Sequence, residues 1–134
     1  MCAQRINPDG LYNSVEFGFS HASISAPGQM LHLAGQVAWD KDCTVVGGTD
    51  LGAQARQCLA NLQAVLADQG LGPADLVRIR TYVVDHSPDK LGPITEALMG
   101  FYGDVVPAPN TLIGVQALAL PDFLIEIEAT AQMP

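Results

Sequence analysis

Positive charge is scarce in this sequence of 134 residues, which has 6 Lys and Arg against 14 Asp and Glu and a formal net charge of −8. Proteins that bind nucleic acids or anionic membranes do so through clustered cations, so this balance disfavours both contacts. The sequence therefore predicts no nucleic-acid partner and no membrane partner.

Long apolar runs are also missing. No stretch approaches the ~20 apolar residues that a membrane-spanning helix needs, and the apolar segment of a signal peptide does not follow residues 1–5. The three cysteines, Cys2, Cys43 and Cys58, are odd in number and widely spaced. They match neither a disulfide framework nor a zinc pattern, so we expect a reduced, cytoplasmic setting.

Cofactor motifs are absent as well. Gly47 and Gly48 lack the sequence context of a phosphate-binding loop, and no Gly-x-Ser-x-Gly turn occurs. The three histidines, His21, His32 and His86, lie far apart without the spacing of metal ligands. We expect no cofactor and no metal.

The sequence does contain enough apolar material for one core. Hydrophobic residues make up 49% of the chain and charged residues 15%, which is a globular composition. A chain of this length commonly forms one domain, and no linker or repeat divides it. We expect a single domain over residues 1–134, with an irregular N-terminal arm over residues 1–15.

Hydrophobic periodicity predicts two helices among several strands. The clearer helix covers residues 50–69, where apolar residues recur three and four apart. The other begins near Lys90, which places Pro93 in the first turn, where a missing N–H breaks no helical bond. Strands are expected at residues 17–25, 30–37, 44–46, 76–84, 111–117 and 123–129, the first two forming a hairpin.

This order, β-β-(β)-α-β-α-β-β, predicts an α+β fold of two layers with both helices on one face of the sheet. The other face is partly apolar, because alternation assigns to it Tyr82, Leu112, Leu124 and either Leu31 or Leu33. An exposed sheet face of this kind is an association surface. We therefore expect an oligomer interface there.

Three features have both a structural and a functional interpretation. Glu126 and Glu128 share one strand face, which is typical of a solvated surface. If a partner covers that face, desolvation raises the pKa of a carboxylate and suits it to proton transfer. Trp39, the only tryptophan, either caps the core or walls a pocket. Cys58 lies on the apolar stripe of the first helix and is expected to be a small core residue.

Several short motifs follow one another between Phe17 and Ala131. They are GFSH at 18–21, AGQV at 34–37, NL at 61–62, VVD at 83–85, PA at 107–108 and IEIEA at 125–129. In this order, and with the predicted topology, the sequence resembles the YjgF/RidA family of small trimeric proteins.

The resemblance implies a chorismate-mutase-like α+β fold and a homotrimer, in which three sheets surround a closed centre and a ligand cleft lies at each subunit interface. It also implies hydrolysis of reactive enamines and imines of the 2-aminoacrylate type to 2-keto acids and ammonia. In the family an arginine holds the substrate carboxylate, backbone groups orient the substrate, and a glutamate assists water or proton transfer.

The match to the family's site is partial. Glu126 aligns with the glutamate, and Gly35 with the glycine whose backbone lines the cleft. Asn110 falls where the arginine is expected, and an uncharged amide holds a carboxylate less strongly by about 1.5–3 kcal/mol. Three further positions also differ from the family: Phe19 and Ala34 replace a tyrosine and a serine, and Thr95 replaces an asparagine.

We therefore expect a more apolar and less cationic cleft, with Glu126 as general acid and base. The substrate-binding residues expected around it are Phe19, Gly35, Trp39, Thr95 and Asn110. The expected ligand is a neutral or aromatic enamine, imine or carbonyl compound, with weak or no activity on 2-aminoacrylate. The alternative is a non-catalytic trimer that binds a small ligand or another protein.

Overall fold

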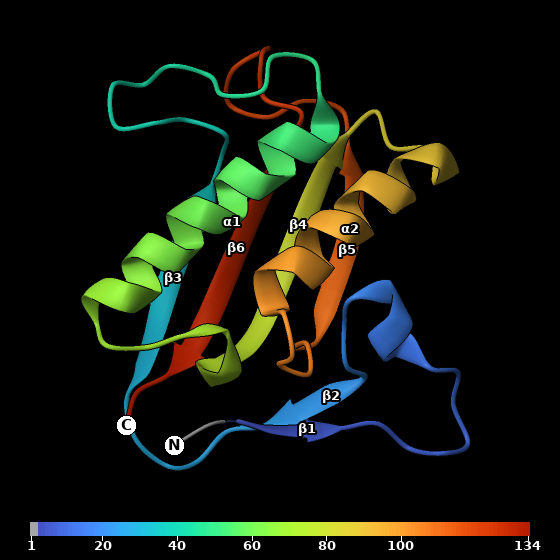
Figure 1. Cartoon of the computed structure of the whole chain (residues 1–134), viewed down its shortest axis with the longest axis vertical. Helices are drawn as coiled ribbons and strands as arrows, with labels where there is room; N and C mark the ends of the chain where they lie inside the picture. Colours follow the sequence, from blue (N-terminus) through green and yellow to red (C-terminus); the bar gives the residue numbers. More distant parts are fainter. Residues whose placement is uncertain (1–2) are drawn as a thin grey trace.

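Two helices pack on one face of a four-stranded sheet in the computed structural model, which describes residues 3–134 (Figure 1). The helices are α1 (Leu51–Asp68) and α2 (Leu91–Tyr102), and the strands of the sheet are β3 (Met30–Gln36), β4 (Leu76–Val84), β5 (Asn110–Val115) and β6 (Ile125–Gln132). The predicted two-layer α+β fold, with both helices on one side, is confirmed.

The sheet is mixed, with the strand order β3-β6-β4-β5. Strand β6 lies in the middle and pairs antiparallel with β3 and with β4. Strands β4 and β5 are parallel, and α2 is part of the crossover between them. Strands β3 and β5 are therefore the two edges of the sheet.

The core lies between the helices and the sheet. Helix α1 buries a stripe that includes Cys58, Leu62 and Leu66, each with no exposed surface. Strand β6 alternates as predicted, so Ile125 and Ile127 are fully buried while Glu126 and Glu128 are only partly buried. Cys58 is thus a small core residue, as its position predicts. Asp50 caps α1, because its side chain accepts a hydrogen bond from the amide of Ala53 at 3.1 Å.

The ends of the elements also follow local chemistry. Helix α2 begins at Leu91 after a short 3-10 turn, η3 (Pro88–Lys90), so Pro93 lies in its first turn as predicted. Another 3-10 turn, η2 (Pro73–Asp75), leads into β4, whose bounds match the predicted 76–84. Among residues 3–134, no helix combines the length and apolarity needed to cross a membrane.

The predicted hairpin of residues 17–25 with 30–37 is wrong. Only β2 (Ala22–Ile24) is a strand there, and it pairs with β1 (Gln4–Ile6) in a separate two-stranded sheet. The segment before β2 forms a 3-10 turn, η1 (Ser14–Phe17), which ends at Gly18 with a positive φ of 87°. Strand β3 instead pairs with the distant β6, and β1 adds a short strand to the arm expected to be irregular.

Smaller differences concern the other predicted strands. The segment at 44–46 makes only one bridge, between Val45 and Trp39. The last two strands are shifted, because β5 ends at Val115 and β6 continues to Gln132. Pairing with β3 extends β6, since Met30 lies opposite Gln132.

The uncovered face of the sheet is less apolar than predicted. Leu33 is only 6% exposed and belongs to the core, and Leu31 and Leu112 pack against that core. The register explains this: Leu33 lies opposite Ala129 and Leu112 opposite Thr81, both on the covered face. The apolar residues of the uncovered face include Tyr82, as predicted, and the neighbouring Ile113, which is 38% exposed. Leu124 precedes β6 and lines a small cavity with Leu51 and Pro93.

Candidate functional site

Glu126 lies in a cavity of about 320 Å³ on the uncovered face of the sheet. The lining residues come from β3, β4, β6 and the loop before β6: Gly35, Tyr82, Leu118, Glu126 and Glu128. Because Tyr82 is the register partner of Glu126, the central strands fix where the carboxylate stands. Of the residues that sequence analysis assigned to the site, Gly35 and Glu126 meet here.

Gly35 is shaped by a break in the strand ladder. Between Leu33 and Gln36 the register of β3 against β6 shifts, which takes Ala34 and Gly35 out of regular pairing. A Cβ at position 35 would lie 2.8 Å from Cδ and 2.9 Å from Cγ of Glu126, and closer still to its Oε1. Only glycine lets the carboxylate approach this backbone so closely.

The second carboxylate of the cavity has a partner within the chain. The hydroxyl of Tyr82 donates a hydrogen bond to Oε1 of Glu128. Arg80 is the register partner of Glu128, and Arg78 and Arg80 line a smaller cavity of about 110 Å³ with Glu128 and Thr130. The cations of this face thus flank Glu128, and neither contributes to the lining of the Glu126 cavity.

Cys58 approaches the same strand from the covered side. Its thiol lies 3.6 Å from the carbonyl oxygen of Ile125. Burial raises the pKa of the Cys58 thiol to about 12, and the negative charge of Glu126 raises it as well. The thiol therefore stays protonated at neutral pH and is a packing group rather than a nucleophile.

Phe19, Thr95 and Asn110 meet in a different cavity of about 360 Å³, beside α2 and the edge strand β5. Its lining is largely apolar: Tyr12, Phe17, Phe19, Leu91, Ile94, Thr95, Leu98, Asn110 and Leu112. Oδ1 of Asn110 accepts a hydrogen bond from the hydroxyl of Thr81 at 3.1 Å, which holds the amide at the start of β5.

Aromatic rings form one wall of this second cavity. The ring centroid of Tyr12 lies 6.4 Å from that of Phe17, 6.3 Å from that of Phe19 and 4.7 Å from that of His21. The His21 ring also hydrogen-bonds to the carbonyl oxygen of Tyr12 through Nε2 at 2.9 Å. Tyr12 and Phe17 are still 60% and 55% exposed, so the wall has an open apolar side.

The two cavities lie on opposite faces of the sheet. Tyr82 and Glu126 face away from the helices, whereas the neighbouring Thr81 is fully buried beneath them and bonds to Asn110. A single chain therefore cannot bring Asn110 and Glu126 onto one ligand.

Trp39 lies apart from both groups. Its ring packs edge-to-face on Phe123 at a centroid distance of 5.2 Å. Asn61 donates to the carbonyl oxygens of Val37 and Trp39 at 3.0 and 2.9 Å, which fastens the end of β3 to α1. In the described chain, neither cavity lining includes Trp39. Across residues 3–134, no three His, Cys, Asp or Glu side chains are placed to hold a metal ion together.

Sequence reasoning missed the aromatic neighbours of Phe19 and the tyrosine that binds Glu128. A signal for the first was present, because the chain has only 3 Tyr and 4 Phe and three of these fall within residues 12–19. Tyr82 was placed on the correct face by alternation. Its bond to Glu128 depends on the β4–β6 register, which the sequence pattern alone does not fix.

Comparison with known proteins identifies the family. The sequence profile described as Endoribonuclease L-PSP matches residues 13–133. RutC family protein slr0709 of Synechocystis is 34% identical over 98% of this chain and 93% of its own length. This chain therefore belongs to the Endoribonuclease L-PSP family, whose members are also named YjgF, Rid and RutC.

Solved structures agree with this assignment. YyfB of Yersinia pestis, a Rid family protein of unknown function, is 56% identical and superposes with a TM-score of 0.96 over 99% of this chain and 100% of its own. Rv2704 of Mycobacterium tuberculosis, a member of the YjgF/YER057c/UK114 family, is 27% identical with a TM-score of 0.64, over 98% of this chain and 99% of its own.

Proposed function

We propose that this chain is a homotrimeric hydrolase of small enamines or imines, with its site formed where two subunits meet. The observation that carries the proposal is the position of Glu126 directly against the bulged backbone of Gly35. One cavity of about 320 Å³ thus contains two kinds of group. The Glu126 carboxylate can transfer a proton, and the peptide groups near Gly35 lie outside the regular strand pairing and can orient a substrate.

The separation of the two cavities supports a site shared between subunits. Asn110 and Phe19 lie beside the edge strand β5, and Glu126 and Gly35 lie on the uncovered face. If a neighbouring subunit docks its β5 edge against this face, its Asn110 half meets the Glu126 half of the first subunit, and the two halves form one site. The exposed Ile113 of β5 and the open side of Tyr12 and Phe17 give such an interface an apolar component.

The chemistry required of these residues is modest. Water adds to the carbon of a C=N bond while Glu126 accepts one proton from that water. The proton then passes to the nitrogen, which gives a carbinolamine. Glu126 next moves the remaining hydroxyl proton to the nitrogen as the C–N bond breaks, so that ammonia leaves and the C=O bond of the product forms. An enamine first takes a proton on carbon and loses one from nitrogen, which gives the imine. The Gly35 backbone and the Asn110 amide orient the substrate.

The lining defines the substrate class that we propose. Among the described residues, neither cavity lining contains Lys or Arg, and the cavity near Phe19 is mainly aliphatic and aromatic. A substrate carboxylate finds no guanidinium fork there. The proposed substrates are therefore neutral, with an apolar or aromatic body, and activity on 2-aminoacrylate is weak or absent.

Release of ammonia from a panel of neutral and acidic imines and enamines tests this function. Glu126→Gln keeps the shape and removes the proton-transferring group, so kcat should fall by about 100-fold or more. Gly35→Ala should lower it as well, because the new methyl displaces the carboxylate. Glu16→Gln on η1 is the matched control and should behave like the wild type. Turnover that persists unchanged in Glu126→Gln would contradict the assignment.

One observation favours a second candidate, a trimer that binds a small apolar ligand without converting it. The cavity near Phe19 holds mostly groups that do no proton chemistry. Saturable binding with no ammonia release from any panel member would select this candidate. The formal charge of −8 supports neither an RNA partner nor a membrane partner, and a cytoplasmic location remains our expectation.

A further inference from the structure

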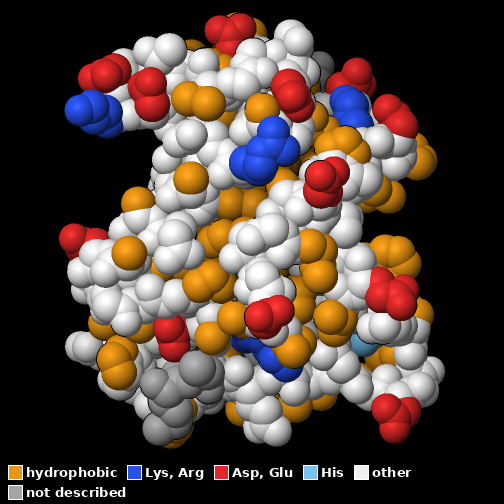
Figure 2. Space-filling view, in the orientation of Figure 1, with side chains coloured by type: hydrophobic (Ala, Val, Ile, Leu, Met, Phe, Trp, Pro, Cys, Tyr) orange, Lys and Arg blue, Asp and Glu red, His pale blue; other side chains and the backbone are white. Residues whose placement is uncertain are grey.

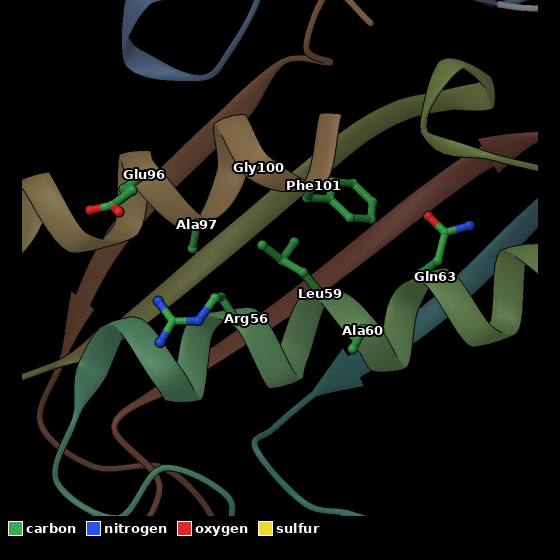
Figure 3. A pocket seen from close by; sticks show the side chains of 8 residues that line it. All are labelled: Arg56, Leu59, Ala60, Gln63, Glu96, Ala97, Gly100 and Phe101. Carbon is green, nitrogen blue, oxygen red and sulfur yellow. The ribbon is translucent and has the colours of Figure 1, made fainter. Parts of the chain in front are cut away.

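A groove of about 600 Å³ runs between α1 and α2, on the helix side of the molecule. It is lined by Arg56, Leu59, Ala60 and Gln63 of α1 and by Glu96, Ala97, Gly100 and Phe101 of α2 (Figure 3). Figure 2 shows hydrophobic side chains along the furrow between the two helices. Neither cavity of the proposed active site shares a residue with it.

The floor of the groove is apolar and hollow. Leu59 and Ala97 are 2% and 5% exposed, and Phe101 borders them. Gly100 lies within α2, and a Cβ at this position would meet nothing within 4 Å. A glycine inside a helix costs about 1 kcal/mol relative to alanine, and packing within this chain does not require it. The hollow therefore suits an additional group that lies against α2 here.

One end of the groove is charged with both signs. Figure 3 shows Arg56 and Glu96 at the same end, on opposite sides, with Gln63 at the far end of the α1 side. Both charged side chains are exposed, and within residues 3–134 they form no ion pair with each other. A guanidinium and a carboxylate that do not neutralise each other can receive a ligand head carrying both charges.

The length of the groove favours a small molecule over a protein segment. From Arg56 to Gln63 the helix rises by about 10 Å. That distance accommodates one extended small molecule, whereas a partner helix would gain contact over only about two turns. The volume also lies within the ~300–1,000 Å³ that is usual for small-molecule sites.

We propose that this groove binds a free α-amino acid with a large apolar side chain. Arg56 holds the carboxylate as a two-pronged donor, and Glu96 accepts from the ammonium group. The side chain lies on Leu59 and Ala97 and extends into the hollow at Gly100. Helix α2 separates this site from the proposed catalytic one, because Thr95 and Leu98 face the other cavity.

Calorimetric titration of the intact protein with L-phenylalanine and L-leucine tests the site. Three analogues separate its parts: 3-phenylpropionate lacks the ammonium, phenethylamine lacks the carboxylate, and N-acetylphenylalanine amide carries neither charge. Each should bind at least about tenfold more weakly than phenylalanine, because each loses charge-assisted hydrogen bonds. No saturable binding of phenylalanine at about 10 mM, or equal binding of the uncharged amide, would overturn the proposal.

Variants locate the bound amino acid. Arg56→Gln and Glu96→Gln should each weaken binding by about tenfold or more, and Gly100→Leu should abolish it by filling the hollow. The matched controls are Lys41→Gln, Glu16→Gln and Ala64→Leu, which alter exposed positions outside the groove. Glu126→Gln should leave the affinity unchanged. Loss of binding in Glu126→Gln, or equal losses in the controls, would place the ligand elsewhere and refute the groove site.

Discussion

At the scale of single residues, the position of Glu126 depends on what is missing beside it. Gly35 has no side chain, so the carboxylate rests on the bulge of β3 instead of extending into solvent. Asn110 is held differently, through the buried hydroxyl of Thr81. The absence of a side chain at position 35 therefore places Glu126, whereas a hydrogen bond places Asn110. Each residue can be tested by a separate experiment.

Replacing Asn110 with arginine tests the preference for neutral substrates. Asn110→Arg supplies the guanidinium that is absent from both cavity linings, so binding of 2-keto or 2-imino acids should tighten by about 10- to 100-fold. The change also leaves the hydroxyl of Thr81 without its partner, which lowers stability. Thr81→Val in the same chain removes that unpaired hydroxyl. Inhibition constants for a series of 2-keto acids provide the measurement.

Asn110→Met is the control for this series, because it has a long side chain without charge. If Asn110→Arg and Asn110→Met bind 2-keto acids equally, Asn110 does not face the ligand. The alignment of Asn110 with the arginine of the family would then be wrong.

At the scale of elements, local patterns predicted α1, α2 and β4 closely, because helical periodicity, capping and strand alternation are written in neighbouring residues. The hairpin of residues 17–25 with 30–37 failed for the opposite reason. Pro27 and Gly28 suit a turn, but β3 pairs with β6 about 100 residues away and β2 pairs with β1. The faces of Leu33 and Leu112 depend on the same distant pairings, and so they were misassigned. The sequence motifs point to Glu126 and Gly35, which line one cavity together, but not to Tyr12 and Phe17, which line the other.

Gln54 links α1 to the loops that precede α1 and β6, and we expect these links to contribute to the stability of the fold. Its fully buried side chain donates to the carbonyl oxygens of Gly48 and Asp122 at 2.7 and 2.9 Å and accepts from the amide of Leu124 at 3.0 Å. Gln54→Leu keeps the volume and removes all three bonds, so the free energy of unfolding should fall by about 2–3 kcal/mol. Urea denaturation at a fixed protein concentration measures this change.

Gln63→Leu provides the matched control on the same helix, because Gln63 is only partly buried and its loss should change the stability by less than about 0.5 kcal/mol. Equal stabilities of the Gln54 and Gln63 variants would show that the three bonds of Gln54 contribute no net stability.

At the scale of the whole molecule, the proposed site exists only if chains associate. The uncovered face combines the exposed Ile113 with Tyr82, Arg80 and two glutamates, and it holds the Glu126 cavity. The cavity near Phe19, with Thr95 and Asn110, lies on the other side of the sheet. Sedimentation should therefore give a mass of about three times 14.1 kDa. Ile113→Lys, which places a charge on that face, should shift the protein toward monomers and reduce turnover together.

Mixing two inactive variants then tests whether the site is shared. Glu126→Gln removes the acid–base group from one half, and Thr95→Trp fills the cavity near Phe19 in the other half. After the two proteins are unfolded together and refolded, about a quarter of the interfaces join an intact Glu126 half to an intact Thr95 half. Activity should return to about that fraction of the wild-type value. If each site lay within one chain, the mixture would be as inactive as its components, although trimers would still form.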